Sequence, residues 1–312
     1  MENAVVSLNV VMPLFIIMVL GYFLKKYKIY DAESLRIFNN VVFRVFLPLN
    51  LFNTIYKTNL SESFDKKLTI FSIGAVIFLF IILLVVVPKL ENVNEKRGVI
   101  IQGLFRSNFV IMGLPIAMNI YGENNVGTVA ILIAFVVPLL NVLAVISLEI
   151  FRDKKIDCIK IIKGILKNPL IIGAFFGIVV LKFNIPIPHF LKITVSELGK
   201  IATPLAILLL GGSFEFHSVE KYFKQTMYIV FLKLIVIPSI FVALGVMAGF
   251  TGIKLLIIYV IFGTPTAVSS FNMAQQMGGD SELAGQIVIF TTMMSIVSIF
   301  IGIFIMKSFN LI

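Results

Sequence analysis

Long apolar runs constrain this chain more than any other feature of its sequence. Residues 67–89 form one such run, and segments of about 20 apolar residues recur along the whole chain. A helix needs that length to cross the hydrocarbon core of a bilayer, which is about 30 Å thick. The runs therefore predict an all-α polytopic membrane protein.

The composition supports the same class. Of the 312 residues, 59% are hydrophobic and 13% are charged, whereas a soluble domain is roughly half apolar and a quarter charged. Glu2 stands where a cleavable signal would carry basic residues, so we expect the first apolar run to stay in the membrane. Cys158 is the single cysteine, which excludes disulfides within the chain and metal clusters built on cysteine.

Ten membrane helices are predicted. Their approximate ranges are 4–24, 34–56, 67–89, 97–120, 126–151, 168–183, 194–213, 222–249, 252–277 and 282–308. Lys and Arg account for the net charge of +10, and they fall in loops, where they set topology rather than bind nucleic acid. The loops beginning near residues 25 and 152 are the most basic and should face the cytoplasm. Both termini of this predicted plasma-membrane protein are then extracytoplasmic.

The two halves of the chain share proline motifs. Pro13-Leu14 matches Pro169-Leu170, and Pro48-Leu49 matches Pro204-Leu205, both at an offset of 156 residues (169 − 13 and 204 − 48). Gly-x-Pro-x-Ala occurs at 113–117 and again at 263–267. Five helices in each half is an odd number, so the matches predict two inverted repeats, 1–152 and 168–312. The basic segment 153–167 between them is expected to be a cytoplasmic linker that forms a short amphipathic surface helix.

The paired Gly-x-Pro-x-Ala motifs predict two broken helices, the fourth and the ninth. A proline removes a backbone donor and fits the first turn of a new helix. We therefore expect a half-helix to begin at Pro115 and another to begin after Thr264, its N-cap, at Pro265. Two helix N-termini that meet at mid-membrane form an electropositive site without a charged side chain, which favours an anion. The alternative is that both prolines merely kink packed helices.

Polar side chains near the two motifs are the candidate ligands. The predicted substrate-binding residues are Asn108, Gly113, Pro115, Asn141, Thr264, Pro265 and Asn272. The predicted accessory or ion-coupling residues are Arg106, Lys233, Ser269, Gln275, Gln276 and Thr291. Amides and hydroxyls can bind a carboxylate or a cation, although isolated Ser and Thr residues also serve helix–helix hydrogen bonding. Because no Asp lies deep in a predicted span, a proton relay through buried carboxylates is poorly supported.

Enzymatic functions find no support in the sequence. His189 and His217 belong to no His-Glu-x-x-His pattern, and no glycine-rich loop ends in Lys-Ser or Lys-Thr. The chain also has no pair of intramembrane aspartates for a protease. We therefore predict a protein that is not an enzyme and that carries no cofactor or bound metal.

At the level of motifs, the chain resembles the auxin efflux carrier family. The resemblance rests on Arg-Ser-Asn-Phe-Val-Ile-Met-Gly-Leu-Pro-Ile-Ala at 106–117, on Gly-Thr-Pro-Thr-Ala-Val-Ser-Ser-Phe-Asn-Met-Ala at 263–274 and on Asn-Pro-Leu at 168–170. It implies a fold related to bile-acid sodium symporters and sodium/proton antiporters. Helices one, two, six and seven would form a scaffold. The other six would move, and the fourth and ninth would cross at the substrate site.

Two departures from the plant members narrow the implied substrate. Gly113 stands where plant exporters carry Asn, and the connector between the repeats is short and basic. The resemblance thus implies a bacterial-type carrier of a small carboxylate such as malate or malonate, or of an auxin-like acid, by an elevator form of alternating access. A sodium-coupled symporter of the bile-acid type, or a membrane sensor or channel with this fold, are the alternatives. The coupling ion, sodium or proton, stays open, and family members imply a homodimer.

Overall fold

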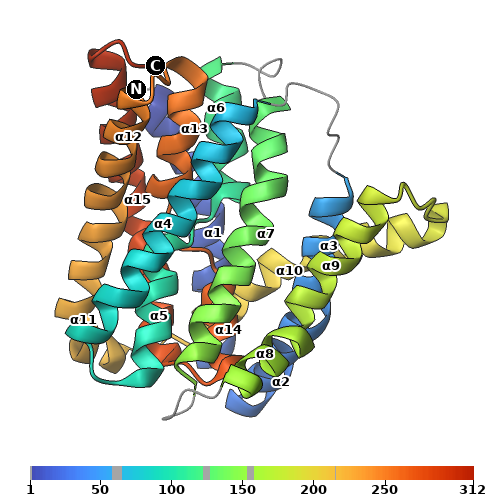
Figure 1. Cartoon of the computed structure of the whole chain (residues 1–312). Helices are drawn as coiled ribbons and strands as arrows, with labels where there is room; N and C mark the ends of the chain where they lie inside the picture. The colour runs from blue at the N-terminus through green and yellow to red at the C-terminus, as the bar shows by residue number, and fades with distance from the viewer. Residues whose placement is uncertain (1, 58–64, 122–126, 153–157, 215) are drawn as a thin grey trace.

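The computed structural model describes residues 2–57, 65–121, 127–152, 158–214 and 216–312, and every regular element in these ranges is a helix (Figure 1). The first half contains α1 (Glu2–Lys26), α2 (Ala32–Val41), η1 (Val42–Phe46), α3 (Leu47–Tyr56), α4 (Lys66–Leu90), α5 (Asn94–Phe105), α6 (Phe109–Tyr121) and α7 (Gly127–Ile150). The second contains α8 (Cys158–Lys167), α9 (Pro169–Lys182), α10 (His189–Gly212), α11 (Phe216–Phe231), η3 (Leu232–Val236), α12 (Ile237–Met247), α13 (Gly252–Gly263), α14 (Ser269–Met277) and α15 (Ser281–Ser308).

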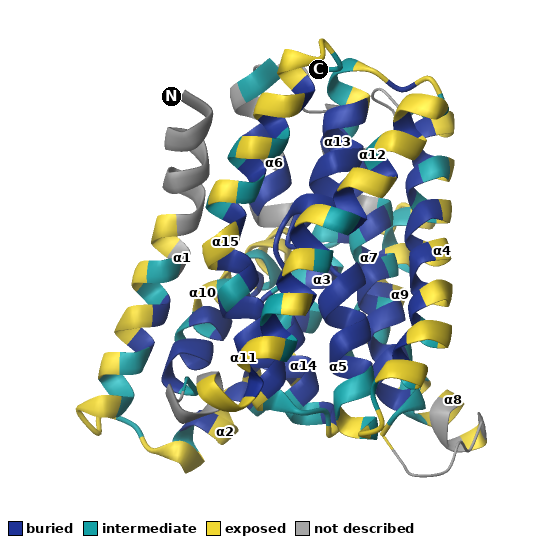
Figure 2. Cartoon of the chain, turned by 90° about the vertical axis from the view of Figure 1, so that its left-hand side faces the viewer, coloured by how far each residue is buried: buried dark blue, intermediate teal, exposed yellow. Residues whose placement is uncertain are grey.

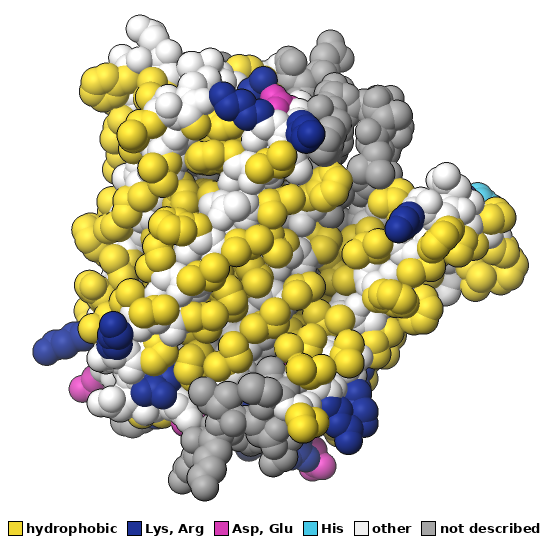
Figure 3. Space-filling model, viewed as in Figure 1, with side chains coloured by type: hydrophobic (Ala, Val, Ile, Leu, Met, Phe, Trp, Pro, Cys, Tyr) yellow, Lys and Arg dark blue, Asp and Glu magenta, His cyan; other side chains and the backbone are white. Residues whose placement is uncertain are grey.

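These helices make a polytopic membrane protein. Within the described residues, five continuous helical stretches are long and apolar enough to cross a bilayer, and shorter apolar helices accompany them. One of the five, α4, covers the predicted run at 67–89 almost to the residue. Figure 3 shows a broad apolar face with Lys and Arg side chains at its two ends, the pattern that a protein embedded in lipid requires. The two termini lie at the same end of the molecule (Figure 1).

The helices pack as two groups. In the first group α1 packs along α10, and α3 packs against both α9 and α10. In the second group α4 to α7 pack with α11 to α15, and their buried faces form the interior seen in Figure 2. Glycine permits the closest approach in the first group, because Gly21 lies against the backbone of Leu208 and Gly211 lies against that of Met18. A Cβ at either glycine would overlap a carbonyl group.

Two π-helical segments precede prolines in long helices. The first, η1, leads to Pro48, and the second, η3, leads to Pro238. Proline lacks the N–H that would continue an α-helical ladder, and a wider turn before it rearranges the remaining bonds. The second segment carries Lys233, which is fully buried. Nothing in the sequence periodicity had indicated either segment.

A short helix in the segment predicted to link the two halves is confirmed within the described residues, and the cytoplasmic position of that segment stays a prediction. The amphipathic segment was predicted at 153–167, and α8 spans Cys158–Lys167, while 153–157 lie outside the described residues. Its Ile159, Ile162 and Leu166 are exposed, and they recur at helical spacing on one face. This exposed apolar stripe fits a helix that lies at a membrane surface.

The first helix break is not at the predicted proline. The fourth predicted span is interrupted at residues 106–108, between α5 and α6, and Pro115 lies within α6 rather than at its start. The prediction that a half-helix begins at Pro115 is therefore wrong. In membranes, a proline inside a helix is tolerated because neighbouring groups pair the freed carbonyl. The break instead follows the polar sequence Arg106-Ser107-Asn108.

The second break contains its proline, but the helix after it begins without a side-chain cap. The ninth predicted span is interrupted between Gly263 and Ser269, so Pro265 lies in the linker. The prediction that Thr264 is the N-cap of the second half-helix is also wrong. Thr264 ends α13, and its hydroxyl donates back to the Val260 carbonyl at 2.9 Å. The N-cap position of α14 is Val268, which provides no side-chain cap.

The helix bounds also correct the register between the halves. The first helix of the broken pair begins at Asn94 in one half and at Gly252 in the other, an offset of 158 residues (252 − 94). That offset agrees within two residues with the 156 of the Pro-Leu pairs. The match of Gly113 with Gly263, at 150 (263 − 113), is out of register because Gly113 lies inside α6 whereas Gly263 ends α13.

Candidate functional site

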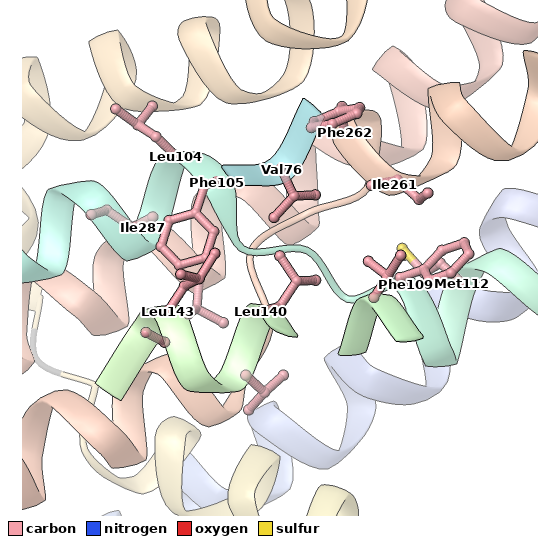
Figure 4. Close-up of a cluster of buried hydrophobic side chains, with 14 of the residues drawn as sticks. Val76, Leu104, Phe105, Phe109, Met112, Leu140, Leu143, Ile261, Phe262 and Ile287 are labelled. Carbon is pink, nitrogen blue, oxygen red and sulfur yellow. The ribbon is translucent and has the colours of Figure 1, made fainter. Parts of the chain in front are cut away.

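The two breaks cross and are bonded to each other. The Asn108 backbone N–H donates to the Pro265 carbonyl at 2.8 Å. The Thr266 hydroxyl donates to the Gly103 carbonyl at 2.7 Å, and the Thr266 N–H donates to the Thr291 hydroxyl at 3.2 Å. Figure 4 shows the linker between Phe105 and Phe109 passing across the linker that follows Phe262. Backbone groups at a helix end have no partner within the helix. At the crossing, residues of one broken span supply partners for such groups of the other.

Apolar packing fixes the helix ends beside the crossing. Phe105, Phe109 and Phe262 are each buried at about 1% exposure or less. Phe262 stacks on Phe241 of α12 with ring centroids 3.9 Å apart. Gly113 packs against the Phe109 ring, where a Cβ would come within 2.7 Å of it, and against Val260 of α13. Gly113 therefore allows α6 and α13 to approach closely, and its predicted role in binding substrate stays a prediction.

Arg106 is the charged residue of the crossing. Its side chain is 2% exposed. One nitrogen donates to Asn141 Oδ1 at 2.6 Å and to Ser269 Oγ at 2.7 Å. The other donates to Ser270 Oγ at 3.2 Å and lies 2.9 Å from the Met273 sulfur. All of these partners are neutral, and no ion pair to Arg106 exists in the described part of the chain.

A cavity of about 130 Å³ lies beside Arg106, between the two groups of helices. Its lining comprises Leu47, Asn50, Leu51, Thr54, Arg106, Ser107, Asn108, Val137, Leu140, Asn141, Leu170, Thr203, Ala206, Ala267, Val268 and Ser269. Among the described residues, Ser107 Oγ and Asn108 Nδ2 are buried and have no hydrogen-bond partner. Such unpaired groups are costly in a protein interior. A polar ligand in the cavity would satisfy them.

Several lining residues come from helices that the sequence analysis did not connect with the site. Asn50 and Thr54 lie on α3, and Thr203 lies on α10. Asn50 donates to the Gly199 carbonyl at 2.9 Å, which ties α3 to α10. The signal was present, because Asn50 follows Pro48-Leu49 and Thr203 precedes Pro204. Those matched prolines mark the places where the first group of helices faces the crossing.

Four predicted site residues line the cavity, and the others lie elsewhere. Arg106, Asn108, Asn141 and Ser269 are brought together. Asn272 and Gln275 lie on α14, and both bond to Asn39 of α2. The Asn272 side-chain amide donates to Asn39 Oδ1, and the Asn39 side-chain amide donates to Gln275 Oε1. This partly buried chain of amides joins α2 to α14 outside the cavity.

The remaining accessory candidates have other neighbours. Lys233 lies in η3, outside the cavity, and its Nζ has no hydrogen-bond partner among the described residues. Thr291 serves the crossing through Thr266, and Gln276 is half-buried on α14. In the described ranges no three His, Cys, Asp or Glu residues are grouped so as to hold a metal ion.

Comparisons with known proteins place the chain among transporters. The family model described as "Membrane transport protein" matches residues 6–161 and 154–303. A protein of Methanocaldococcus jannaschii named as an uncharacterized transporter is 24% identical over 306 residues, which covers 94% of this chain and 97% of the relative. A Rhizobium meliloti protein, named "Putative malonate transporter", is 23% identical over 93% of each chain. An uncharacterized transporter of Escherichia coli K12 is 22% identical over 85% of this chain and 86% of its own length.

Proposed function

The chain belongs to the Membrane transport protein family, and on that basis we propose that it carries a small organic anion across the membrane, bound in the cavity at the crossing. The proposal names a substrate class and a site, and both go beyond family membership. One observation carries it: a buried guanidinium, bonded only to neutral groups, forms part of the wall of a cavity that is lined by both polar and apolar side chains.

The charge of Arg106 is the main argument for an anion. Burying a charge away from water is costly unless an opposite charge or hydrogen bonds compensate it. Asn141, Ser269 and Ser270 provide oxygen atoms but no negative charge. A carboxylate in the cavity would supply that charge, and it could take paired donors from the planar guanidinium by displacing neutral acceptors such as Asn141 and Ser269.

The helix ends add to the same preference. Both α6 and α14 begin at the crossing, at Phe109 and Ser269. Helix N-termini present N–H groups and a partial positive charge, which favour an anion within the first turn. The unpaired donors of Ser107 and Asn108 lie at the same cavity. Charge, dipoles and donors therefore favour the same class of ligand.

The position of the cavity supports alternating access. It lies between the helix group of α1, α3, α9 and α10 and the helix group that carries the crossing. A relative movement of the two groups would expose the cavity first to one face and then to the other. We infer that the halves are inverted repeats, that ten spans cross the bilayer, that both termini are extracytoplasmic, and that the second group moves as an elevator.

Malonate is the first substrate to test, because one relative carries it in its name. In detergent, the purified protein should show a melting temperature that rises with malonate concentration, since a ligand that binds only the folded state stabilises it by mass action. Malonamide, of the same shape but neutral, should leave it unchanged. In proteoliposomes, labelled malonate should show saturable counterflow, which a channel or sensor would not support.

Charge variants make the test specific to the site. Arg106→Gln should abolish both the malonate-dependent shift and counterflow, whereas Arg106→Lys, which keeps the charge but loses the paired geometry, should retain a weakened response. An equal shift in the wild type and in Arg106→Gln would refute the site. Counterflow with and without a sodium gradient, and with and without a proton gradient, tests the coupling ion and the bile-acid-type alternative.

A further inference from the structure

A second cavity lies away from the crossing, between α1, α10 and α15. Its volume is about 360 Å³, within the range of roughly 300–1,000 Å³ that is typical of ligand pockets. Its walls come mainly from aromatic and aliphatic side chains, and none of its lining residues is charged. This lining suits a hydrocarbon chain and offers no partner to a polar metabolite.

The cavity opens toward the region of lipid. Met18 and Ile289 form its buried part, at 6% and 5% exposure, whereas Val19 and Met293 are 44% and 40% exposed at its rim. The wall made by α1 and α10 is tightly packed, because Gly211 lies against the Met18 backbone. In a bilayer the exposed apolar rim faces hydrocarbon, so the surrounding lipid is the nearest source of an occupant.

Basic residues lie at the end of the same helix. Lys25 and Lys26 occupy the last turn of α1. Lys26 Nζ lies 6.0 Å from the ring centroid of Tyr22, which lines the cavity. From Met18 to Lys26 the helix rises about 12 Å, at roughly 1.5 Å per residue. That rise is shorter than one hydrocarbon leaflet, which is about 15 Å thick.

We propose that this cavity holds an acyl chain of an anionic phospholipid whose phosphate binds Lys25 and Lys26. The chain would enter between Val19 and Met293, and the headgroup would lie at the membrane surface beside the last turn of α1. Basic side chains at the cytoplasmic end of a membrane helix attract anionic lipid headgroups. The site joins a helix of each group, because α1 and α15 both contribute walls.

The chain contains no tryptophan, which permits a clean optical test. Phe290→Trp places a single emitter in the cavity wall, and brominated acyl chains quench tryptophan on contact. In nanodiscs, brominated phosphatidylglycerol should half-quench this emitter at a mole fraction about fivefold to thirtyfold lower than brominated phosphatidylcholine does, the effect expected when one or both of the two lysines lie near the anionic headgroup. Phe78→Trp on α4, which is 57% exposed, is the matched control and should not distinguish the two lipids.

Two further variants separate the headgroup from the acyl chain. In the Phe290→Trp background, Lys25→Gln with Lys26→Gln should remove the preference for phosphatidylglycerol. Met293→Trp at the rim repeats the measurement if tryptophan at 290 prevents folding. Equal quenching by the two lipids at both reporters would overturn the anionic headgroup. If brominated lipids quench both reporters less than they quench Phe78→Trp, the cavity does not hold an acyl chain.

Discussion

Thr266→Val tests whether the two breaks depend on each other. The substitution keeps the shape of the side chain but removes the hydroxyl that donates to the Gly103 carbonyl at 2.7 Å. Thr266 is 1% exposed, so the carbonyl is left unpaired in the interior, at a cost of about 1–3 kcal/mol. For a chain of 312 residues, that loss corresponds to a fall in melting temperature of about 1.5–5 °C. The fall in melting temperature is measured by heating the protein in detergent and recording the remaining folded fraction by size-exclusion chromatography.

Thr264→Val is the matched control. Thr264 is equally buried and lies two residues away, but its hydroxyl donates to the Val260 carbonyl of its own helix. The Val260 carbonyl also accepts the Thr264 N–H at 3.3 Å, so it keeps a partner in the variant. We expect Thr266→Val to be the less stable of the two and to lose the malonate-dependent shift. Equal melting temperatures would contradict a structural dependence of one break on the other.

Two further predictions concern parts of the chain outside the crossing. Gly211→Ala should destabilise the packing of α1 on α10 and lower the melting temperature, because its Cβ would overlap the Met18 carbonyl, whereas Gly74→Ala, with open space around it, should leave it unchanged or raise it. Asp65 accepts from the Leu68 N–H and pairs with Lys254 at 2.6 Å, and the hydrogen bond from Lys254 holds the pKa of Asp65 below its usual range. The stabilisation from this ion pair is therefore present above pH about 4, near the ordinary pKa of Asp. It is lost as the pH falls through the lower pKa that Asp65 has in the folded protein. Asp65→Asn should lower the free energy of unfolding by less than about 1 kcal/mol at pH 7. If the unfolding midpoints of the wild type and the variant differ as much in acid as at neutral pH, the ion pair is not the cause.

Hydropathy and length predicted the helical class and the long apolar helices because they act locally. The α4 helix was placed almost to the residue at 67–89, since an apolar run of that length has few alternatives in a bilayer. The amphipathic linker helix was found from the spacing of Ile159, Ile162 and Leu166. By contrast, η1 and η3 depend on how each helix rearranges its bonds before a proline, which composition does not encode.

The candidate site was predicted in part, and the errors have physical causes. Arg106 and Asn108 were chosen from their positions beside the fourth-helix motif and Asn141 from its position in the middle of the fifth predicted helix, and all three line the cavity. Pro115 was expected to begin a half-helix, because proline is the usual breaker, but the break forms where the second linker pairs the freed backbone, through the Thr266 hydroxyl and the Pro265 carbonyl. The polar residues on α3 and α10 became visible only in the structure, because packing between distant segments creates the cavity.

The interlocked breaks have a consequence for synthesis of the chain. Gly103 and Thr266 are 163 residues apart, so the ribosome must add that length before the carbonyl meets its partner. At about 5–20 residues per second, the interval is roughly 8–30 seconds. Throughout it, the nascent first half holds an open helix end with no partner yet made. Any pause in elongation between residues 103 and 266 lengthens the time for which this helix end lacks its partner.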